Sequence, residues 1–156
     1  MGTNRISPNP ILPKIPFAIC PIRASLGVLG RRWAMLLMRD VAALKLSRFS
    51  EMLRNNPGLT PRALSMRLRD LQKEGLIEKV VNPKDDRDIR YRLTRKGQDV
   101  LPILAAFIQF GIKHYAERVF DDGKPRDLLE VFPGRQKELL GSLMSYSRNQ
   151  NGLRGG

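Results

Sequence analysis

The sequence predicts a mainly α-helical fold with one small β-hairpin. Three observations support this class: a helix over residues 48–55 followed by a Pro-Gly turn, a second helix that begins at Thr60-Pro61 and ends at Gly75, and two short strand-like runs after it. Thr is a good N-cap, Pro suits the first helical position, and Gly commonly follows the last helical residue. Helix, turn, helix and hairpin in this order are the layout of a winged helix-turn-helix.

Two further helices are predicted before this unit. The first follows Cys20-Pro21 and ends at Gly30. The second starts at Arg31 and carries large apolar residues at the spacing of a buried helix face, namely Trp33, Leu36, Leu37 and Val41. Trp33 is interpreted as a core anchor, because no neighbouring residue suggests a base-stacking or cofactor platform.

The helix after Thr60 is amphipathic. Leu64, Leu68 and Leu71 fall at i, i+4 and i+7, so they share one buried stripe. The same period turns a second set away from the stripe, comprising Arg62, Ser65, Met66, Arg69 and Lys73. Arg67 lies nearer the stripe and is interpreted as structural. The exposed basic face is free to meet a polyanion.

Two strands are predicted after this helix. Residues 76–81 are rich in apolar and β-branched side chains, and residues 89–93 alternate strictly. The inward positions of the second strand are Ile89, Tyr91 and Leu93. Residues 82–88 form a turn-rich tip of mixed charge, for which a solvated loop is the plain interpretation and the preceding helix favours a wing. Arg90 and Arg92 share the outer face of the second strand.

A long helix is predicted from near Arg95 to Val119, capped by Thr94 and either kinked or restarted at Pro102. Its middle is apolar on nearly all sides, at Val100, Leu101, Ile103, Leu104, Phe107, Ile108, Phe110 and Ile112. These side chains are too many for one buried stripe, so a second copy of the chain is the economical covering for some of them. The expected dimer interface comprises Leu101, Leu104, Phe107, Ile108 and Gly111.

The chain is expected to divide into four parts. Pro-rich residues 1–19 form an extended N-terminal arm, and residues 20–119 form the winged helix with its dimerisation helix. Residues 120–147 form a helical C-terminal extension whose last helix runs from Arg135 to Tyr146. Residues 148–156 are expected to be a disordered tail.

Charge narrows the range of partners. The 156 residues have a formal net charge of +13, and residues 1–98 hold 20 Lys and Arg against 8 Asp and Glu, whereas residues 99–156 hold 8 against 7. A positive field attracts nucleic acid or an anionic membrane surface, and the plain alternative is a merely basic surface. A membrane fits poorly, because no apolar run is long enough to span a bilayer. No signal peptide is evident, so a cytoplasmic protein is expected.

Metal, cofactor and catalytic sites have little support. Cys20 is the single cysteine and His114 the single histidine, so neither a cysteine-based zinc site nor an internal disulfide can form. The sequence also lacks recognisable paired carboxylates, a phosphate-binding loop and a nucleophile beside a base. It therefore predicts no cofactor and no metal, and an enzyme is the weakest functional interpretation. His114 is expected to be an ordinary surface or interface residue.

Several segments together resemble a known family. They are Cys-Pro at residues 20–21, Leu-Gly-Arg-Arg-Trp at 29–33, Arg-Phe-Ser-Glu-Met-Leu at 48–53, the helix at 64–74, Gly-Leu-Ile at 75–77 and Tyr-Arg-Leu-Thr-Arg-Lys-Gly at 91–97. In this order and spacing, the chain resembles the HxlR-type winged helix-turn-helix transcriptional regulators, which are related to the MarR regulators. It departs from the usual pattern in two places. Arg31-Arg32 replaces the more common Gly-Lys and suggests an added phosphate contact, and the segment after Asp121 is longer.

The resemblance implies a prokaryotic homodimer that binds an inverted-repeat operator in double-stranded DNA, with each recognition helix in a major groove. It also implies dimerisation through the N-terminal helix and the long helix after the wing. The expected fold is therefore a winged helix-turn-helix with flanking dimerisation helices. No effector is assigned.

In the winged-helix docking mode, the helix after Thr60 is the recognition helix, and its N-terminal half points at base edges. The candidate base readers are Arg62, Ser65, Met66 and Arg69, with phosphate binding as the alternative for Arg69. The candidate backbone contacts are Arg48, Ser50, Thr60, Lys73, Lys84, Arg87 and Arg90. For each of these residues, solvated surface is the alternative interpretation.

Cys20 is a candidate redox residue. It precedes Pro21 at a helix N-terminus, where partial positive charge stabilises a thiolate. Some members of the family resembled here sense oxidants or electrophiles through the equivalent cysteine. The preferred interpretation is a small, partly buried cap without a sensing role.

Sequence-specific transcriptional regulation is the leading functional prediction. A non-specific architectural DNA-coating protein shares the positive charge and the dimer, and competition with unrelated DNA separates the two. A winged helix used as a protein interaction module needs no outward arginines and shows little salt-dependent affinity for nucleic acid.

Overall fold

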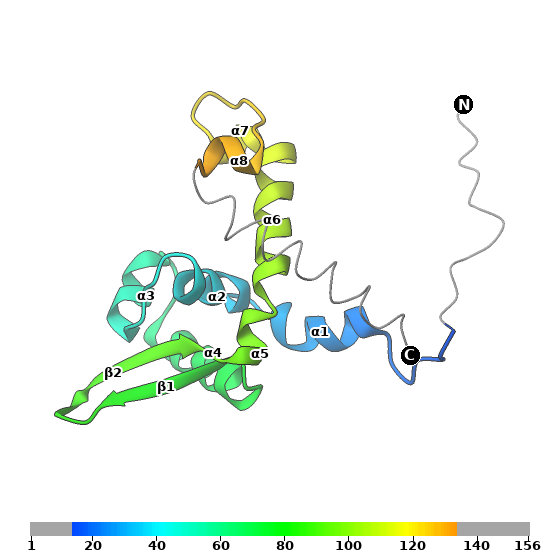
Figure 1. The fold of residues 1–156 in the computed structure, drawn as a ribbon. Coiled ribbons are helices and arrows are strands. Elements are labelled where there is room, and N and C mark those ends of the chain that lie inside the picture. The colour runs from blue at the N-terminus through cyan, green and yellow to red at the C-terminus, as the bar shows by residue number, and fades with distance from the viewer. Residues whose placement is uncertain (1–13, 134–156) are drawn as a thin grey trace, which may run out of the picture.

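The computed structural model describes residues 14–133. In this part, helices pack together with one antiparallel hairpin (Figure 1). Four helices come first: α1 (Pro21–Leu29), α2 (Ala34–Ala42), α3 (Phe49–Asn55) and α4 (Pro61–Lys73). The strands β1 (Ile77–Asn82) and β2 (Asp85–Leu93) follow, and then α5 (Arg95–Gln98), α6 (Leu101–His114), α7 (Ala116–Val119) and α8 (Leu128–Val131). The mainly α-helical class with a small hairpin is therefore confirmed. None of these helices combines the length and apolar character needed to cross a membrane.

The core lies between α2, α3, α4 and the hairpin. Leu37 of α2, Met52 of α3 and Ile77 of β1 are buried in one cluster, and each contributes roughly 1.5–3 kcal/mol by leaving water. The stripe predicted on α4 is confirmed, since its buried residues are Leu64, Leu68 and Leu71. The expectation that Leu36 is a core residue is wrong: it is 39% exposed, because the helix turns its neighbour Leu37 inward.

The loop between α1 and α2 is longer than predicted. Helix α1 begins after Cys20 and ends before Gly30, as expected, but α2 begins at Ala34 and not at Arg31. Trp33 precedes α2 with a φ of 74°, in the left-handed region, so the chain turns there instead of continuing as a helix. The Trp33 ring packs against the core, which confirms its interpretation as an anchor.

The hairpin has a tighter tip than predicted. Strands β1 and β2 pair antiparallel from Ile77 opposite Leu93, and their register shifts near the tip, where Asn82 lies opposite Asp85. The expected loop over residues 82–88 is wrong, because β2 begins at Asp85. Short polar side chains close the turn: the Asn82 side-chain oxygen accepts the Lys84 N–H at 3.0 Å.

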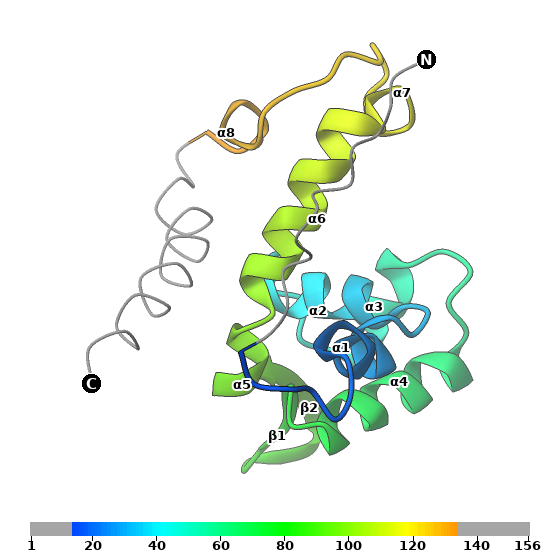
Figure 2. The same cartoon turned by 90° about the vertical axis from the view of Figure 1, so that its right-hand side faces the viewer.

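The expected long helix is divided into three. The Thr94 hydroxyl caps α5 by accepting the Gly97 N–H at 3.0 Å, and Pro102 lies in the first turn of α6. Of the two predicted outcomes at Pro102, the structure has the restart, because a proline ring fits the first turn of a helix and not its interior. A second break at Tyr115 separates α6 from α7. Figures 1 and 2 show α6 projecting away from the body formed by α2, α3, α4 and the hairpin.

The segment after α7 returns to α6. The Leu128 N–H donates to Gln109 Oε1 at 3.3 Å, and the Leu128 side chain is buried. Helix α8 was not predicted. The expected last helix from Arg135 to Tyr146 and the tail at residues 148–156 lie outside the described residues, as do residues 1–13 of the N-terminal arm.

Candidate nucleic-acid interface

The outer face of α4 presents the predicted base readers. They are all exposed, and they comprise Arg62, Ser65, Met66 and Arg69. Met66 is 51% exposed although it is apolar. Thr60 fixes the start of the helix, because its hydroxyl oxygen accepts the Ala63 N–H at 3.2 Å. The N-terminal half of α4 is therefore ordered by its own cap.

Two arginines of this face lack an acidic partner. Across residues 14–133, no carboxylate lies within ion-pairing distance of Arg62 or Arg69. Arg67 differs, because its Nε donates to the Arg32 carbonyl at 3.0 Å and its Nη1 to Asp70 at 2.7 Å. Arg67 is structural, as predicted. The charges of Arg62 and Arg69 are available to an anionic ligand.

Asp70 joins α4 to the loop before α2. Its carboxylate accepts hydrogen bonds from Arg31 Nη1 at 2.9 Å and from Arg67 Nη1 at 2.7 Å. Arg31 Nε also donates to the Gly27 carbonyl at 2.8 Å. The suggested phosphate contact of Arg31 thus gives way to an ion pair inside the subunit. Exposed pairs contribute about 0–1 kcal/mol, so this one orients α4 more than it stabilises the fold.

Asp88 anchors the wing to α3. Its carboxylate accepts from Asn82 Nδ2 at 3.2 Å, from Arg90 Nε at 3.2 Å and from Arg48 Nη2 at 3.0 Å. The hydrogen bond from Asn82, followed by that from Arg90, lowers the pKa of Asp88 below its usual value. The ionised carboxylate offsets part of the charge of Arg48 and Arg90, which reduces the attraction of these two arginines for a phosphate.

The tip of the wing holds two cations that form no ion pair with any described residue. Lys84 and Arg87 are exposed, and neither forms an ion pair within the described part of the chain. Arg92 is paired, because its Nε donates to Glu78 Oε1 at 2.6 Å. The cations of the tip that stay outside ion pairs with described residues are therefore Lys84 and Arg87, although Asp85 and Asp86 beside them leave the tip without a net positive charge.

The start of α3 is fixed by Glu51. Its carboxylate accepts the Ser47 and Arg48 backbone N–H groups, both at 2.9 Å. These bonds, that from Arg48 first, lower the pKa of Glu51. The cap holds Ser50 and Arg48 on a rigid helix end rather than on a loose loop.

The candidate residues gather at one end of the molecule. Figures 1 and 2 place α4 and the hairpin at the end opposite α7 and α8, and α4 contacts β1. All the predicted backbone contacts are exposed, namely Arg48, Ser50, Thr60, Lys73, Lys84, Arg87 and Arg90. The arrangement offers a protruding basic helix beside a hairpin tip that presents Lys84 and Arg87, which suits a helix in a groove and a hairpin tip on a phosphate backbone.

Sequence reasoning missed a buried polar group behind this surface. Asp40 is fully buried, and its carboxylate accepts hydrogen bonds from Arg39, Asn55 and Asn56. The available signal was a carboxylate at a position close to Leu37 and Val41 in a helix that is mostly apolar. Buried acids are rare unless they are paired, so this position called for partners that only the fold supplies.

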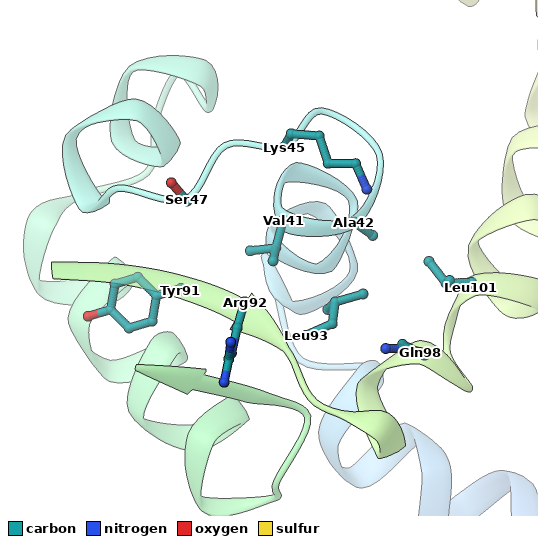
Figure 3. A pocket seen from close by; sticks show the side chains of 9 residues that line it. All are labelled: Val41, Ala42, Lys45, Ser47, Tyr91, Arg92, Leu93, Gln98 and Leu101. Carbon is teal, nitrogen blue, oxygen red and sulfur yellow. The ribbon is translucent and has the colours of Figure 1, made fainter. Parts of the chain in front are cut away.

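A hollow lies where the wing joins the body, and Figure 3 shows its lining side chains. The lining comes from α2, the following connector, β2, α5 and α6, and comprises Val41, Ala42, Lys45, Ser47, Tyr91, Arg92, Leu93, Gln98 and Leu101. The Tyr91 N–H donates to the Ser47 carbonyl at 2.7 Å, which ties β2 to the connector. Partial burial raises the pKa of Tyr91, so its hydroxyl stays protonated. At this hollow, strand β2 of the wing and the first turn of α6 line the same space.

Helix α6 has one buried and one exposed apolar face. Leu104 is 8% exposed and belongs to the core of its own subunit, whereas Phe107 is 62% exposed. The other expected interface residues are half-buried: Leu101, Ile108 and Gly111. Ile103 and Phe110, which were not assigned to the interface, are 40% and 53% exposed. Ile103, Phe107 and Phe110 fall at i, i+4 and i+7, and we call these three residues the α6 stripe.

Cys20 and His114 both lie on the surface. Cys20 is at the N-cap position of α1, as predicted, but its side chain makes no capping hydrogen bond. The thiol is exposed, so the expected partial burial is wrong. His114 is exposed at the end of α6, with its ring centroid 4.9 Å from that of Phe110.

With this geometry established, comparison with known proteins assigns the family. Residues 28–119, more than half of the chain, match the model of the HxlR-like helix-turn-helix family. The chain belongs to this family. It is a transcriptional regulator of the winged-helix type, and the resemblance seen in the sequence is confirmed.

Individual relatives agree with this assignment. An HTH-type transcriptional regulator from Methanothermobacter thermautotrophicus is 35% identical over 106 residues, which cover 68% of this chain and 79% of that protein. The solved structure of PA1607, a putative transcription factor, is 38% identical with a TM-score of 0.55, and the match covers 60% of this chain and 64% of that chain. The oxidised form of the redox regulator HypR is 28% identical with a TM-score of 0.54, over 59% of this chain and 94% of that chain.

Proposed function

We propose that this regulator binds duplex DNA as a homodimer on an inverted-repeat operator in the cytoplasm. In this proposal α4 enters the major groove and the tip of the wing lies on the phosphate backbone. The observation that carries it is the outer face of α4, where Arg62 and Arg69 are exposed and have no acidic partner among the described residues. A winged helix used only for protein contacts has no need of such a face.

The roles within the interface follow from position and charge. Base reading is assigned to Arg62, Ser65, Met66 and Arg69, because arginine bonds guanine in a bidentate manner, serine donates or accepts, and methionine packs against a thymine methyl group. Backbone contacts are assigned to Arg48, Ser50, Thr60, Lys73, Lys84, Arg87 and Arg90. Lys84 and Arg87 form no ion pair within the described residues, whereas Arg48 and Arg90 share the Asp88 carboxylate and must release it to bind a phosphate fully.

The α6 stripe supports the homodimer. Three large apolar side chains on one exposed helix face are costly in water, and a second copy of the same stripe covers them by two-fold symmetry. Phe110 also packs edge-on against the Tyr115 ring at 5.7 Å, which extends the apolar surface towards α7. Stable interfaces bury about 800 Å² per partner, so the stripe needs further contacts, for which the exposed apolar residues of α1 are available.

Selection of bound fragments from the host's genomic DNA tests the proposal. Enrichment of one sequence that survives an excess of unrelated DNA is the expected result. Equal retention of all fragments would indicate an architectural DNA-coating protein. Retention of no fragment at low salt would leave a protein interaction module and would refute DNA binding.

Alanine substitutions are expected to separate base readers from backbone contacts. Arg62→Ala and Arg69→Ala should each weaken operator binding by about tenfold or more and change binding to random DNA much less. Lys84→Ala and Arg90→Ala should weaken both alike and reduce the slope of log affinity against log salt by about one or less. Titration of labelled operator and random duplexes at several salt concentrations measures these changes.

The control for these variants is Lys124→Ala, which removes the same charge from an exposed position between α7 and α8, at the opposite end of the molecule. This variant should change the affinity for operator DNA and for random DNA by no more than about twofold. Equal losses on operator and random DNA for all four substitutions would mean that the assigned base readers are backbone contacts.

Oxidation of Cys20 is expected to leave operator binding unchanged. HypR is described as a redox regulator, but the exposed thiol of Cys20 makes no hydrogen bond that would order it. Operator affinity before and after treatment with peroxide should therefore agree within about twofold in the wild type and in Cys20→Ser. Peroxide sensitivity that disappears in Cys20→Ser would contradict this expectation and make the protein a redox-responsive regulator.

A further inference from the structure

Asp40 is a fully buried carboxylate that the DNA interface does not use. Its Oδ1 accepts from Arg39 Nη2 at 2.6 Å, from Arg39 Nε at 3.0 Å and from Asn55 Nδ2 at 3.0 Å. Its Oδ2 accepts from Asn56 Nδ2 at 2.5 Å. Asp40 is 0% exposed and Asn56 3%, so water does not compete for these bonds.

These bonds hold the turn that precedes α4. Asn56 is the residue after α3, and its Nδ2 also donates to the Met52 carbonyl at 2.7 Å. The Asn56 carbonyl in turn accepts the Leu59 N–H at 3.0 Å, which closes the turn. One carboxylate on α2 therefore fixes both the end of α3 and the path of the chain into the Thr60 cap.

We propose that Asp40 is a positioning residue for the base readers at the N-terminal half of α4. This inference rests on the proposed DNA binding and names a residue that acts on it without touching DNA. Arg62 follows Asn56 by six residues along the chain, and every one of them belongs to the turn or to the first helical positions. The Asp70 pair holds the other half of α4, so the Asp40 network acts on the end that carries Arg62 and Ser65, where it sets the path of the chain into the Thr60 cap.

A carboxylate is required because all its neighbours are donors. Asn56 Nδ2 faces Asp40 Oδ2, and Arg39 and Asn55 face Oδ1. In Asp40→Asn an amide nitrogen meets one of these donors. If Asn56 rotates to accept instead, its bond to the Met52 carbonyl is lost. Either arrangement leaves a buried polar group unpaired at the turn.

The first test compares operator and random DNA. Asp40→Asn should lower operator affinity by about tenfold to a hundredfold, as expected when one or two base contacts are misplaced, and random-DNA affinity by less than about threefold. Asp99→Asn is the control, because Asp99 is exposed and forms no ion pair within residues 14–133. It should change neither affinity by more than about twofold.

A second variant removes the partner amide. Asn56→Ala keeps the Asp40 carboxylate but loses the bond between the two residues. Combined with Asp40→Asn, it should lower operator affinity little more than the larger of the two single losses, because both changes break the same contact. A merely structural loss of stability predicts instead that the two defects in the core weaken binding by the sum of their separate losses.

Amide hydrogen exchange in the free protein provides a readout that needs no DNA. In Asp40→Asn, exchange should accelerate at Leu59 and Ala63, while the hydrogen-bonded amides of Leu37 and Leu76 in the core stay protected. Uniform acceleration, equal losses on both DNAs, or a double variant that shows the sum of the two single losses would each overturn the proposal. If the wild type prefers no sequence, the proposed function fails, and the exchange pattern still tests whether Asp40 positions the turn.

Discussion

Replacing Phe107 by glutamate is expected to convert the proposed homodimer into a folded monomer. Phe107 is 62% exposed within one subunit, so the substitution leaves the core of that subunit intact. At a two-fold interface the change places two carboxylates in the same apolar contact. Burying an unpaired charge costs several kcal/mol, which raises the dissociation constant of the dimer by about a thousandfold.

Sedimentation across a range of concentrations measures this change. Val81→Glu is the control, because Val81 is also an exposed apolar residue, at 43%, but lies on β1. It should sediment like the wild type, and Ile108→Glu should behave like Phe107→Glu. A wild-type protein that is monomeric at micromolar concentration would refute the dimer.

Replacing Gly97 by alanine is expected to cause the largest loss of stability among single methyl additions in the described part. A Cβ at Gly97 would lie 1.9 Å from the Leu76 carbonyl oxygen. That oxygen belongs to backbone at the start of the hairpin and also accepts the Thr94 N–H at 3.1 Å, so it cannot move away freely. The free energy of unfolding should fall by about 3 kcal/mol, which corresponds to a melting temperature lower by roughly 10 °C.

Gly27→Ala is the matched control for this experiment. An added Cβ at Gly27 meets no atom within 4 Å, and the residue lies inside α1, where alanine favours the helix. Thermal unfolding followed by circular dichroism should give a melting temperature equal to or above that of the wild type. If Gly97→Ala also melts like the wild type, the close approach of Gly97 to the Leu76 carbonyl is contradicted.

The elements predicted best from the sequence are those with local signals. Thr60 and Gly75 delimit α4, and the leucine period assigns its buried side, because caps and helix periodicity depend on near neighbours. The start of α2 was misplaced, since nothing local distinguishes a left-handed Trp33 from a helical one. The hairpin tip was too long for a related reason: polar residues favour turns, but cross-strand pairing decides where a turn ends.

For the candidate site, the sequence predicts which side chains are exposed but not which of them are paired with one another. Periodicity predicts that Arg62 and Arg69 face outward, but it does not reveal that Asp88 is shared by Arg48 and Arg90, which depends on where the wing folds. The sequence also does not reveal that Leu104 packs into the core of its own subunit, because a helix that is apolar on all sides does not indicate which side is covered by which partner. The Asp40 network joins residues 15 and 16 positions apart and needs the tertiary fold.

Footprinting on a selected genomic fragment is the most direct test of the central claim that two copies of α4 read an inverted repeat. Two α4 helices held by one two-fold axis should protect two patches related by a dyad, with centres about 34 Å apart, one turn of the duplex, or a multiple of that distance. Protection should weaken in both patches together in Arg62→Ala. A single unsymmetrical patch protected by a stable monomer would contradict both the dimer and the placement of α4 in the major groove.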